Sequence, residues 1–236
     1  MVKRVILYGI LGVTLLIGAL FWKTILSTGY GYHVQQLLTG RPYLDTTPVP
    51  YRFADTDEFA TLSTVTIGDI RIPVTFPVES SSSTDTYVVA RGSEADGDNI
   101  LLLSGFGVAD MFTANADVDS EVTCTILSAQ GEDICTSNYL LYKTMLETTS
   151  DDITLLSSRE EKIAFSMLYI LKATLSMPGT IDAFETEVIR GFRYNRPGET
   201  SWVVFFVDDA QYEMTTSLGR EEFDYILDNI ERVPDR

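Results

Sequence analysis

Histidine and cysteine are nearly absent from this chain of 236 residues, which has one histidine and two cysteines. A structural zinc site uses about four nitrogen or sulfur ligands, and a cysteine nucleophile needs a base beside it. The histidine, His33, is far in sequence from Cys124 and Cys135, and ten residues separate the two cysteines, too many for a redox CxxC pair. The composition therefore argues against zinc binding, Cys–His catalysis and thioredoxin-like chemistry.

Clusters of lysine and arginine are missing as well. The chain has 17 basic and 34 acidic residues, a formal net charge of −17, and every acidic residue follows Lys23. Nucleic-acid binding depends on basic side chains that displace counterions from phosphate, so we expect no binding to DNA or RNA. The acidity has two interpretations: it keeps the domain soluble, or it steers a basic partner.

Signature motifs of catalysis are also lacking. The stretch from Ser104 to Gly107 invites comparison with phosphate loops and nucleophile elbows, but it has no GxGxxG, no following GK[ST] and no glycine two places before the serine. It is typical of a tight turn after a strand. The sequence therefore predicts no catalytic residue and no cofactor, and we expect the protein not to be an enzyme.

One long uncharged run is present, from Val5 to Trp22, preceded by Lys3 and Arg4 and followed by Lys23. A bilayer core of about 30 Å needs roughly 17 to 25 apolar residues, so the run predicts a single transmembrane helix. It is longer than the apolar part of a usual signal peptide and lacks a small-x-small cleavage site. These features favour a retained signal-anchor, although the positive start is shared with cleaved signals.

The basic residues before the run predict a cytoplasmic N-terminus and a domain on the other side of the membrane. We expect a cytoplasmic stub and signal-anchor in residues 1–26, a juxtamembrane connector in 27–50, and one extracytoplasmic domain in 51–236. The predicted location is the bacterial inner membrane, with the domain in the periplasm or outside. The absence of an Asn-x-Ser/Thr sequon agrees with a bacterial origin.

The predicted compartment gives the cysteines an interpretation. Outside the cytoplasm thiols are oxidised, so we expect one disulfide between Cys124 and Cys135 within the domain. Closing such a short loop stabilises the fold by about 3 kcal/mol.

Two acidic clusters are weak candidates for a calcium site. Asp96 and Asp98 lie in one expected loop, and Asp117 and Asp119 lie in another. Carboxylate oxygens at alternate positions are ligands that Ca²⁺ accepts, but neither loop has the glycine and terminal glutamate of an EF-hand. Surface turns explain both clusters more simply, and we expect no metal.

The first part of the domain reads as strands. Residues 64–67 and 70–76 flank Gly68-Asp69, a pair that suits a type II′ hairpin. The serine-rich stretch 80–85 is expected to be a surface loop. Strands are expected at 87–91 and 100–103, and the second is apolar at successive positions, which predicts burial on both faces or under a helix.

Helical patterns follow the second cysteine. A short helix is expected at 138–147, and Ser158 with Glu161 forms a capping box that opens a long helix over 159–177. The width of its apolar stripe predicts packing across a sheet. The last third predicts an antiparallel meander and a closing helix, with strands at 184–194, 202–207 and 212–217 and the helix at 220–232. The fold class is thus α+β, a transmembrane helix followed by a mainly antiparallel sheet flanked by helices.

The order of these last elements, with the closing sequence from Glu221 to Ile230, resembles the PsbP-like α/β/α sandwich family over about the last eighty residues. The resemblance implies a curved antiparallel sheet between helices and a non-catalytic accessory or assembly role. It carries no catalytic residues across.

The functional expectation is a membrane-anchored module that binds another envelope or membrane protein. A variant is an immunity-type neutraliser of a basic toxin, since opposite charge accelerates encounter. A different class is a carboxylate-dependent hydrolase of envelope glycans, which needs two carboxyl groups at a productive separation in a cleft. A ligand sensor is a third possibility, but the stub before the apolar run is very short.

Overall fold

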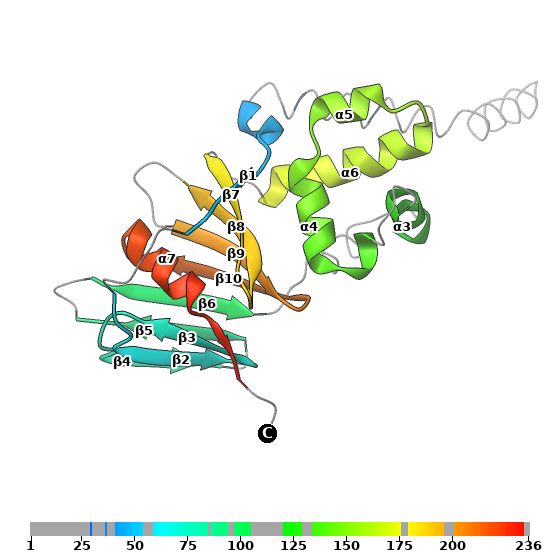
Figure 1. Cartoon of the computed structure of the whole chain (residues 1–236). Helices are drawn as coiled ribbons and strands as arrows, with labels where there is room; N and C mark the ends of the chain where they lie inside the picture. The colour runs from blue at the N-terminus through cyan, green and yellow to red at the C-terminus, as the bar shows by residue number, and fades with distance from the viewer. Residues whose placement is uncertain are drawn as a thin grey trace, which may run out of the picture.

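The computed structural model describes residues 41–53, 59–84, 86–93, 97–104, 120–128, 134–175, 179–195 and 201–233, together with Gly29 and Gln36. These residues form two sheets and a layer of helices (Figure 1). The larger sheet has eight strands in the order β1-β7-β8-β9-β10-β6-β5-β4, and the smaller has three in the order β11-β3-β2. Neighbouring strands are antiparallel except for β1 and β7.

The strands of the larger sheet are β1 (Val49–Pro50), β4 (Ser80–Ser83), β5 (Tyr87–Arg91), β6 (Asn99–Ser104), β7 (Thr180–Glu185), β8 (Arg190–Asn195), β9 (Ser201–Val207) and β10 (Ala210–Thr216). Those of the smaller sheet are β2 (Ser63–Ile67), β3 (Ile70–Val74) and β11 (Glu231–Arg232). The helices are η1 (Pro42–Asp45), α3 (Ser120–Ser128), η2 (Ile134–Thr136), α4 (Asn138–Glu147), α5 (Ser150–Leu155), α6 (Arg159–Leu175) and α7 (Arg220–Asp228).

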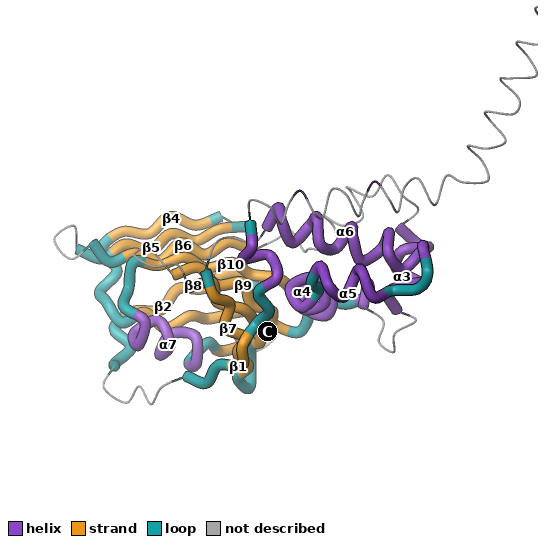
Figure 2. The backbone as a smooth tube through the Cα atoms, turned by 90° about the horizontal axis from the view of Figure 1, so that it is seen from above, coloured by secondary structure: helices purple, strands orange, loops and turns teal. Residues whose placement is uncertain are grey.

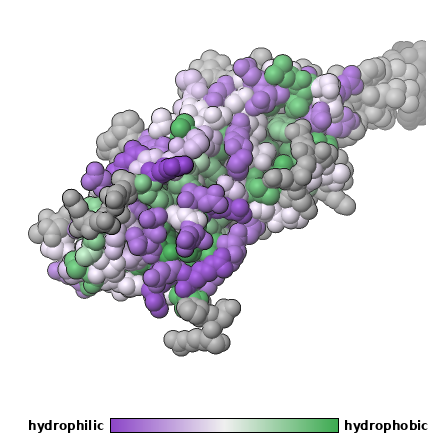
Figure 3. Space-filling view, viewed as in Figure 1, coloured by the Kyte–Doolittle hydropathy of each residue, from purple (hydrophilic) through white to green (hydrophobic). Residues whose placement is uncertain are grey.

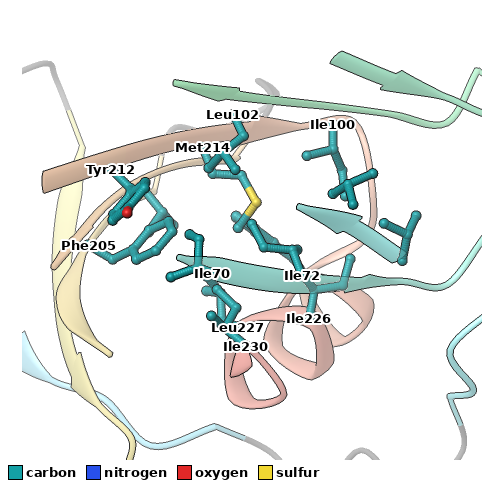
Figure 4. Close-up of a cluster of buried hydrophobic side chains, with 14 of the residues drawn as sticks. Ile70, Ile72, Ile100, Leu102, Phe205, Tyr212, Met214, Ile226, Leu227 and Ile230 are labelled. Carbon is teal, nitrogen blue, oxygen red and sulfur yellow. The ribbon is translucent and has the colours of Figure 1, made fainter. Parts of the chain in front are cut away.

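The first core lies between the two sheets and α7. Figure 4 shows side chains of β3, β6, β9, β10 and α7 converging there, among them Ile72, Leu102, Met214 and Leu227. All four of these side chains are fully buried. The inner face of β5, β6 and β10 is therefore covered by a second sheet and one helix.

The second core lies on the opposite face of the same large sheet, under the helical layer. Along β9, Val203, Phe205 and Val207 belong to the first core, whereas Val204 and Phe206 belong to the second. This alternation is the period of a strand with both faces buried. The helices contribute Leu141 and Leu168, among others, to the second core.

The helix starts follow local capping chemistry. Ser137 Oγ accepts a hydrogen bond from the amide of Leu140 at the start of α4, and Ser158 Oγ accepts one from Glu161 at the start of α6. Thr149 and Asp152 form a complete capping box on α5. The predicted helices 138–147 and 159–177 are confirmed over Asn138–Glu147 and Arg159–Leu175.

The segment before the sheets is fixed to the helical layer by two charged side chains. Asp45 accepts hydrogen bonds from the amide and hydroxyl of Ser150, at 2.8 and 2.7 Å, and from the Tyr169 hydroxyl at 2.9 Å. The fully buried Lys172 ammonium donates to three carbonyl oxygens, those of Leu146, Thr148 and Thr46. It thereby satisfies carbonyls at the C-terminal end of α4, which a helix leaves unpaired.

The predicted fold class is corrected by the structure. In the ranges that the structure describes, no helix is long and apolar enough to cross a membrane. The predicted span, Val5 to Trp22, and its flanking residues Lys3, Arg4 and Lys23 lie outside those ranges. The described fold is mixed α/β, and its inner face is covered mainly by a second sheet, because β2 and β3 carry apolar side chains that need a partner layer.

Three element predictions are also wrong. The predicted single strand 184–194 is two strands, β7 and β8, joined by a turn in which Thr186 Oγ1 accepts from the amides of Val188 and Ile189. The predicted helix 220–232 ends at Asp228, and Glu231–Arg232 pairs with β3. The serine-rich stretch predicted as a loop contains β4, which pairs with β5. The hairpin of β2 and β3 around Gly68 is confirmed.

Candidate functional site

The outer face of β5 and β6 carries apolar side chains that point away from the first core. Because side chains alternate along a strand, the partners of the buried Val88, Ala90, Ile100 and Leu102 face outward. The ladder pairs Tyr87 with Leu103 and Val89 with Leu101 across the two strands. We call these four residues the outer patch: Tyr87, Val89, Leu101 and Leu103.

The described helices do not cover the outer patch. The strand residues of the second core come from β7, β8 and β9, and Figures 1 and 2 show α3 to α6 grouped at the end away from β4 and β5. Leu103 is 41% exposed, and the other three residues are half-buried. Contiguous apolar side chains on a surface mark an interaction site more often than scattered ones do.

A hollow of about 410 Å³ lies beside the patch, over β4 and β5. It is lined by Ser80, Ser81, Ser82, Tyr87, Val89 and Arg91. The serine side chains are short and all exposed, so they leave open the space next to Tyr87 and Val89. The hollow joins the patch to the edge of the sheet.

A carboxyl group borders the patch on β10, where Glu213 lies opposite Leu103. Burial raises the pKa of Glu213 above its ordinary value of 4.5, and hydrogen bonds with Trp202 and Gln211 act in the other direction. A partly desolvated carboxylate next to apolar side chains favours a cation as its neighbour.

A buried ionic cluster lies on the inner side of β7 and β8. Arg193 and Asp224 are each 1% exposed and form an ion pair, and the Tyr51 hydroxyl donates to the other oxygen of Asp224 at 2.5 Å. Asp182 lies 3.7 Å from Arg193 Nε and 3.0 Å from Arg220. Both guanidinium groups stack on the Tyr51 ring, at 4.4 and 4.7 Å from its centroid.

This cluster holds elements together. It joins the segment after β1, strands β7 and β8, and helix α7. Arg193 Nε and Nη2 have no hydrogen-bond partner among the described residues. Asp182 and Asp224 are the two carboxylates that the hydrolase hypothesis would assign to catalysis. Both form ion pairs with Arg193. None of the described hollows is lined by them.

A second hollow, of about 230 Å³, lies at the turns β7–β8 and β9–β10. Its basic groups have partners: Arg232 is paired with Asp208, and the Arg190 guanidinium stacks on the Tyr139 ring at 3.9 Å from the centroid. It is smaller than the roughly 300 to 1,000 Å³ typical of ligand pockets.

The predicted site residues are placed as follows. Cys124 is disulfide-bonded, and Cys135 is the only other cysteine of the chain. Of the calcium candidates, Asp98 lies just before β6, whereas Asp96, Asp117 and Asp119 lie outside the described residues, as does His33. No group of three or more possible metal ligands occurs in the described ranges.

Comparison with known proteins gives no relative: no family model, no curated protein and no solved structure matches this chain. The resemblance to the PsbP-like family therefore stays a prediction. The outer patch was not among the predicted sites, although the signal for it was the run of successive apolar residues in 100–103.

Proposed function

We propose that this protein is a non-catalytic binding module, an accessory or assembly subunit whose partner is another protein. The observation that supports the proposal is the outer patch. Strand β6 has the composition of a strand buried on both faces, yet the side chain of Leu103, on its outer face, is 41% exposed. Covering such a face removes apolar area from water at about 25 cal/mol per Å².

The partner is a protein with a basic surface beside an apolar one. The chain has a formal net charge of −17, and Glu213 lies at the border of the patch with a raised pKa. A lysine or arginine placed there pairs with the carboxylate and offsets the cost of its burial. Figure 3 shows hydrophilic residues over much of one face of the molecule, with smaller hydrophobic areas between them.

The proposed compartment in which the protein acts is outside the cytoplasm. The disulfide at Cys124 supports this, because such bonds persist in oxidising compartments and are rare in reducing ones. Neutralisation of a basic toxin is a variant of the same function, favoured by the same charge. It differs in one respect: the toxin's activity must fall when the complex forms.

Site-specific photo-crosslinking in cells tests the proposal. A photoreactive amino acid replaces Leu103 in one protein and Leu155 in another. Leu155 is the matched control because it is 82% exposed and lies on α5, in the helical layer. We expect one protein with a basic surface to be captured from position 103 and not from position 155. Equal capture from both positions, or none from position 103, contradicts the proposal.

A further inference from the structure

We propose that the free edge of β4 takes an added strand: an extended segment of the partner protein that carries apolar residues at alternate positions and lysine or arginine at its ends. The inference rests on the proposed function and specifies how the partner binds. It concerns a different feature from the outer patch, namely the backbone of Ser81 and Ser83.

Among the described strands, β4 is the last of the large sheet and pairs with β5 alone. The amide of Thr84 donates a hydrogen bond to the carbonyl of Tyr87 at 2.8 Å. This bond shows that the backbone N–H of Thr84 points toward β5. Because alternate residues of a strand bond to opposite sides, Ser82, opposite Val89, faces β5 as well. The N–H and C=O groups of Ser81 and Ser83 therefore point away from the sheet.

Within Ser80–Ser83 the edge carries no lysine and no proline. Natural edge strands are blocked by lysine, proline, a bulge or a covering segment. The four residues of β4 are all serine and all exposed. Their side chains leave the backbone accessible, so the strand can template another one.

The hollow next to this edge gives the added strand a place for its side chains. It is lined by the serines of β4 together with Tyr87, Val89 and Arg91. An added strand lies about 4.8 Å from β4, and every second side chain points to the outer face. The short serines allow a large apolar side chain to reach across to Tyr87 and Val89, so alternate apolar residues are expected in the segment.

Charge decides between a partner segment and a second copy of this chain. The exposed Glu79 precedes β4, and Asp85 follows it in sequence. Pairing two copies through β4 joins two chains that each carry a formal net charge of −17. Like charges across a pair of strands are destabilising. A segment with basic ends is attracted by the same groups.

The first test uses a synthetic probe and the full chain. The probe is a seven-residue peptide of alternating threonine and valine with a lysine at each end, and the control peptide has glutamate at each end. Amide signals of the protein are followed by NMR. We expect shifts and slower hydrogen exchange at Ser81 and Ser83, with the lysine peptide binding about tenfold more tightly than the control.

Three results overturn the inference. The first is no change at Ser81 and Ser83 with the lysine peptide, and the second is equal binding of both peptides. The third is protection of both amides in the free protein that rises with protein concentration, because it shows that a second copy takes the edge.

The second test uses the partner captured through position 103. Ser81→Pro removes an outward N–H without removing a bond to β5, and proline is tolerated on edge strands. Ser81→Ala is the control because it leaves the backbone intact. We expect the proline variant to lose about tenfold or more in affinity and the alanine variant to bind like the original.

The two proposals fail in distinguishable ways. If Leu103→Asp weakens partner binding and Ser81→Pro does not, the edge inference falls and the proposed function stands. If neither variant weakens binding, both fall. Should the proline variant fail to fold, hydrogen exchange at Ser81 and Ser83 in the complex replaces it: protection supports the inference, and unchanged exchange overturns it.

Discussion

Leu102 and Leu103 are neighbours in β6 that face opposite environments: Leu102 is fully buried between the two sheets, and Leu103 is 41% exposed on the outer face. One strand thus contributes to the folded core on one side and offers an apolar surface on the other. This separation allows stability and binding to be altered independently.

The first prediction concerns that separation. Leu102→Ala is expected to lower the free energy of unfolding by about 2 to 5 kcal/mol, because it leaves a cavity in the core. Leu103→Ala is expected to change it by less than about 1 kcal/mol, because its side chain already contacts water. Urea unfolding followed by circular dichroism measures both. Equal losses contradict the placement of the two side chains.

The second prediction concerns the buried ion pair. Asp224→Ala removes the partner of Arg193 and leaves a buried guanidinium without its main counter-charge, so a loss of about 3 to 5 kcal/mol is expected. Tyr51→Phe removes one hydrogen bond to the same carboxylate, for about 1 kcal/mol.

A double-mutant cycle shows whether these groups act together. Combining Asp224→Ala with Arg193→Met removes both charges, and the double variant is expected to be more stable than Asp224→Ala alone. If the double variant's loss of stability, measured from the original protein, equals the sum of the two single losses, the two side chains are not coupled.

The third prediction is a pH dependence. Burial lowers the pKa of Lys172 from 10.5 to about 8, against the attraction of Asp45 and Asp152. Between these two values the unfolded chain holds a proton that the folded chain has released, so stability rises with pH in this window. The expected gain is about 1 kcal/mol between pH 8 and 9.

The window is best read below pH 9, because tyrosines of the unfolded chain, whose ordinary pKa is 10.0, begin to titrate above it. Burial raises the pKa of Tyr142 and of Tyr169 in the folded chain, which makes stability fall with pH there. Lys172→Met is the control, and its stability is expected to be flat between pH 8 and 9. If the stability of this variant still rises with pH, the effect comes from a group other than Lys172.

The fourth prediction concerns the disulfide. Peptide mapping by mass spectrometry under non-reducing conditions is expected to recover Cys124 linked to Cys135. Reduction is expected to cost about 3 kcal/mol and to speed hydrogen exchange in α3 and η2 more than in the sheets. Uniformly faster exchange across both sheets contradicts a local effect.

Sequence patterns predicted the elements whose local and tertiary signals agree. The strongly apolar run 202–207 and the capping serine before α6 led to the correct strand and helix. The strand β4 was missed because four serines carry no apolar pattern, and only the pairing with β5 makes them a strand. The hairpin of β7 and β8 was missed because a threonine side chain, with no glycine or proline, makes its turn.

The candidate site could be predicted in part. The run 100–103 predicted burial on both faces or under a helix, and this is wrong for the outer face, where Leu103 is 41% exposed. Which face is covered depends on where the helices pack, and this is a tertiary property. The cluster around Arg193 was beyond sequence reasoning, since its partners Tyr51 and Asp224 are distant in the chain and meet only when β8 and α7 pack together.

The most direct test of the account is the affinity of the captured partner for two matched variants, Leu103→Asp and Leu155→Asp. Both introduce one carboxylate at an exposed leucine, the first in the outer patch and the second in the helical layer. The account predicts that Leu103→Asp weakens the complex at least about tenfold, with the fold intact by circular dichroism, and that Leu155→Asp binds like the original. Equal affinities of the two variants would contradict it.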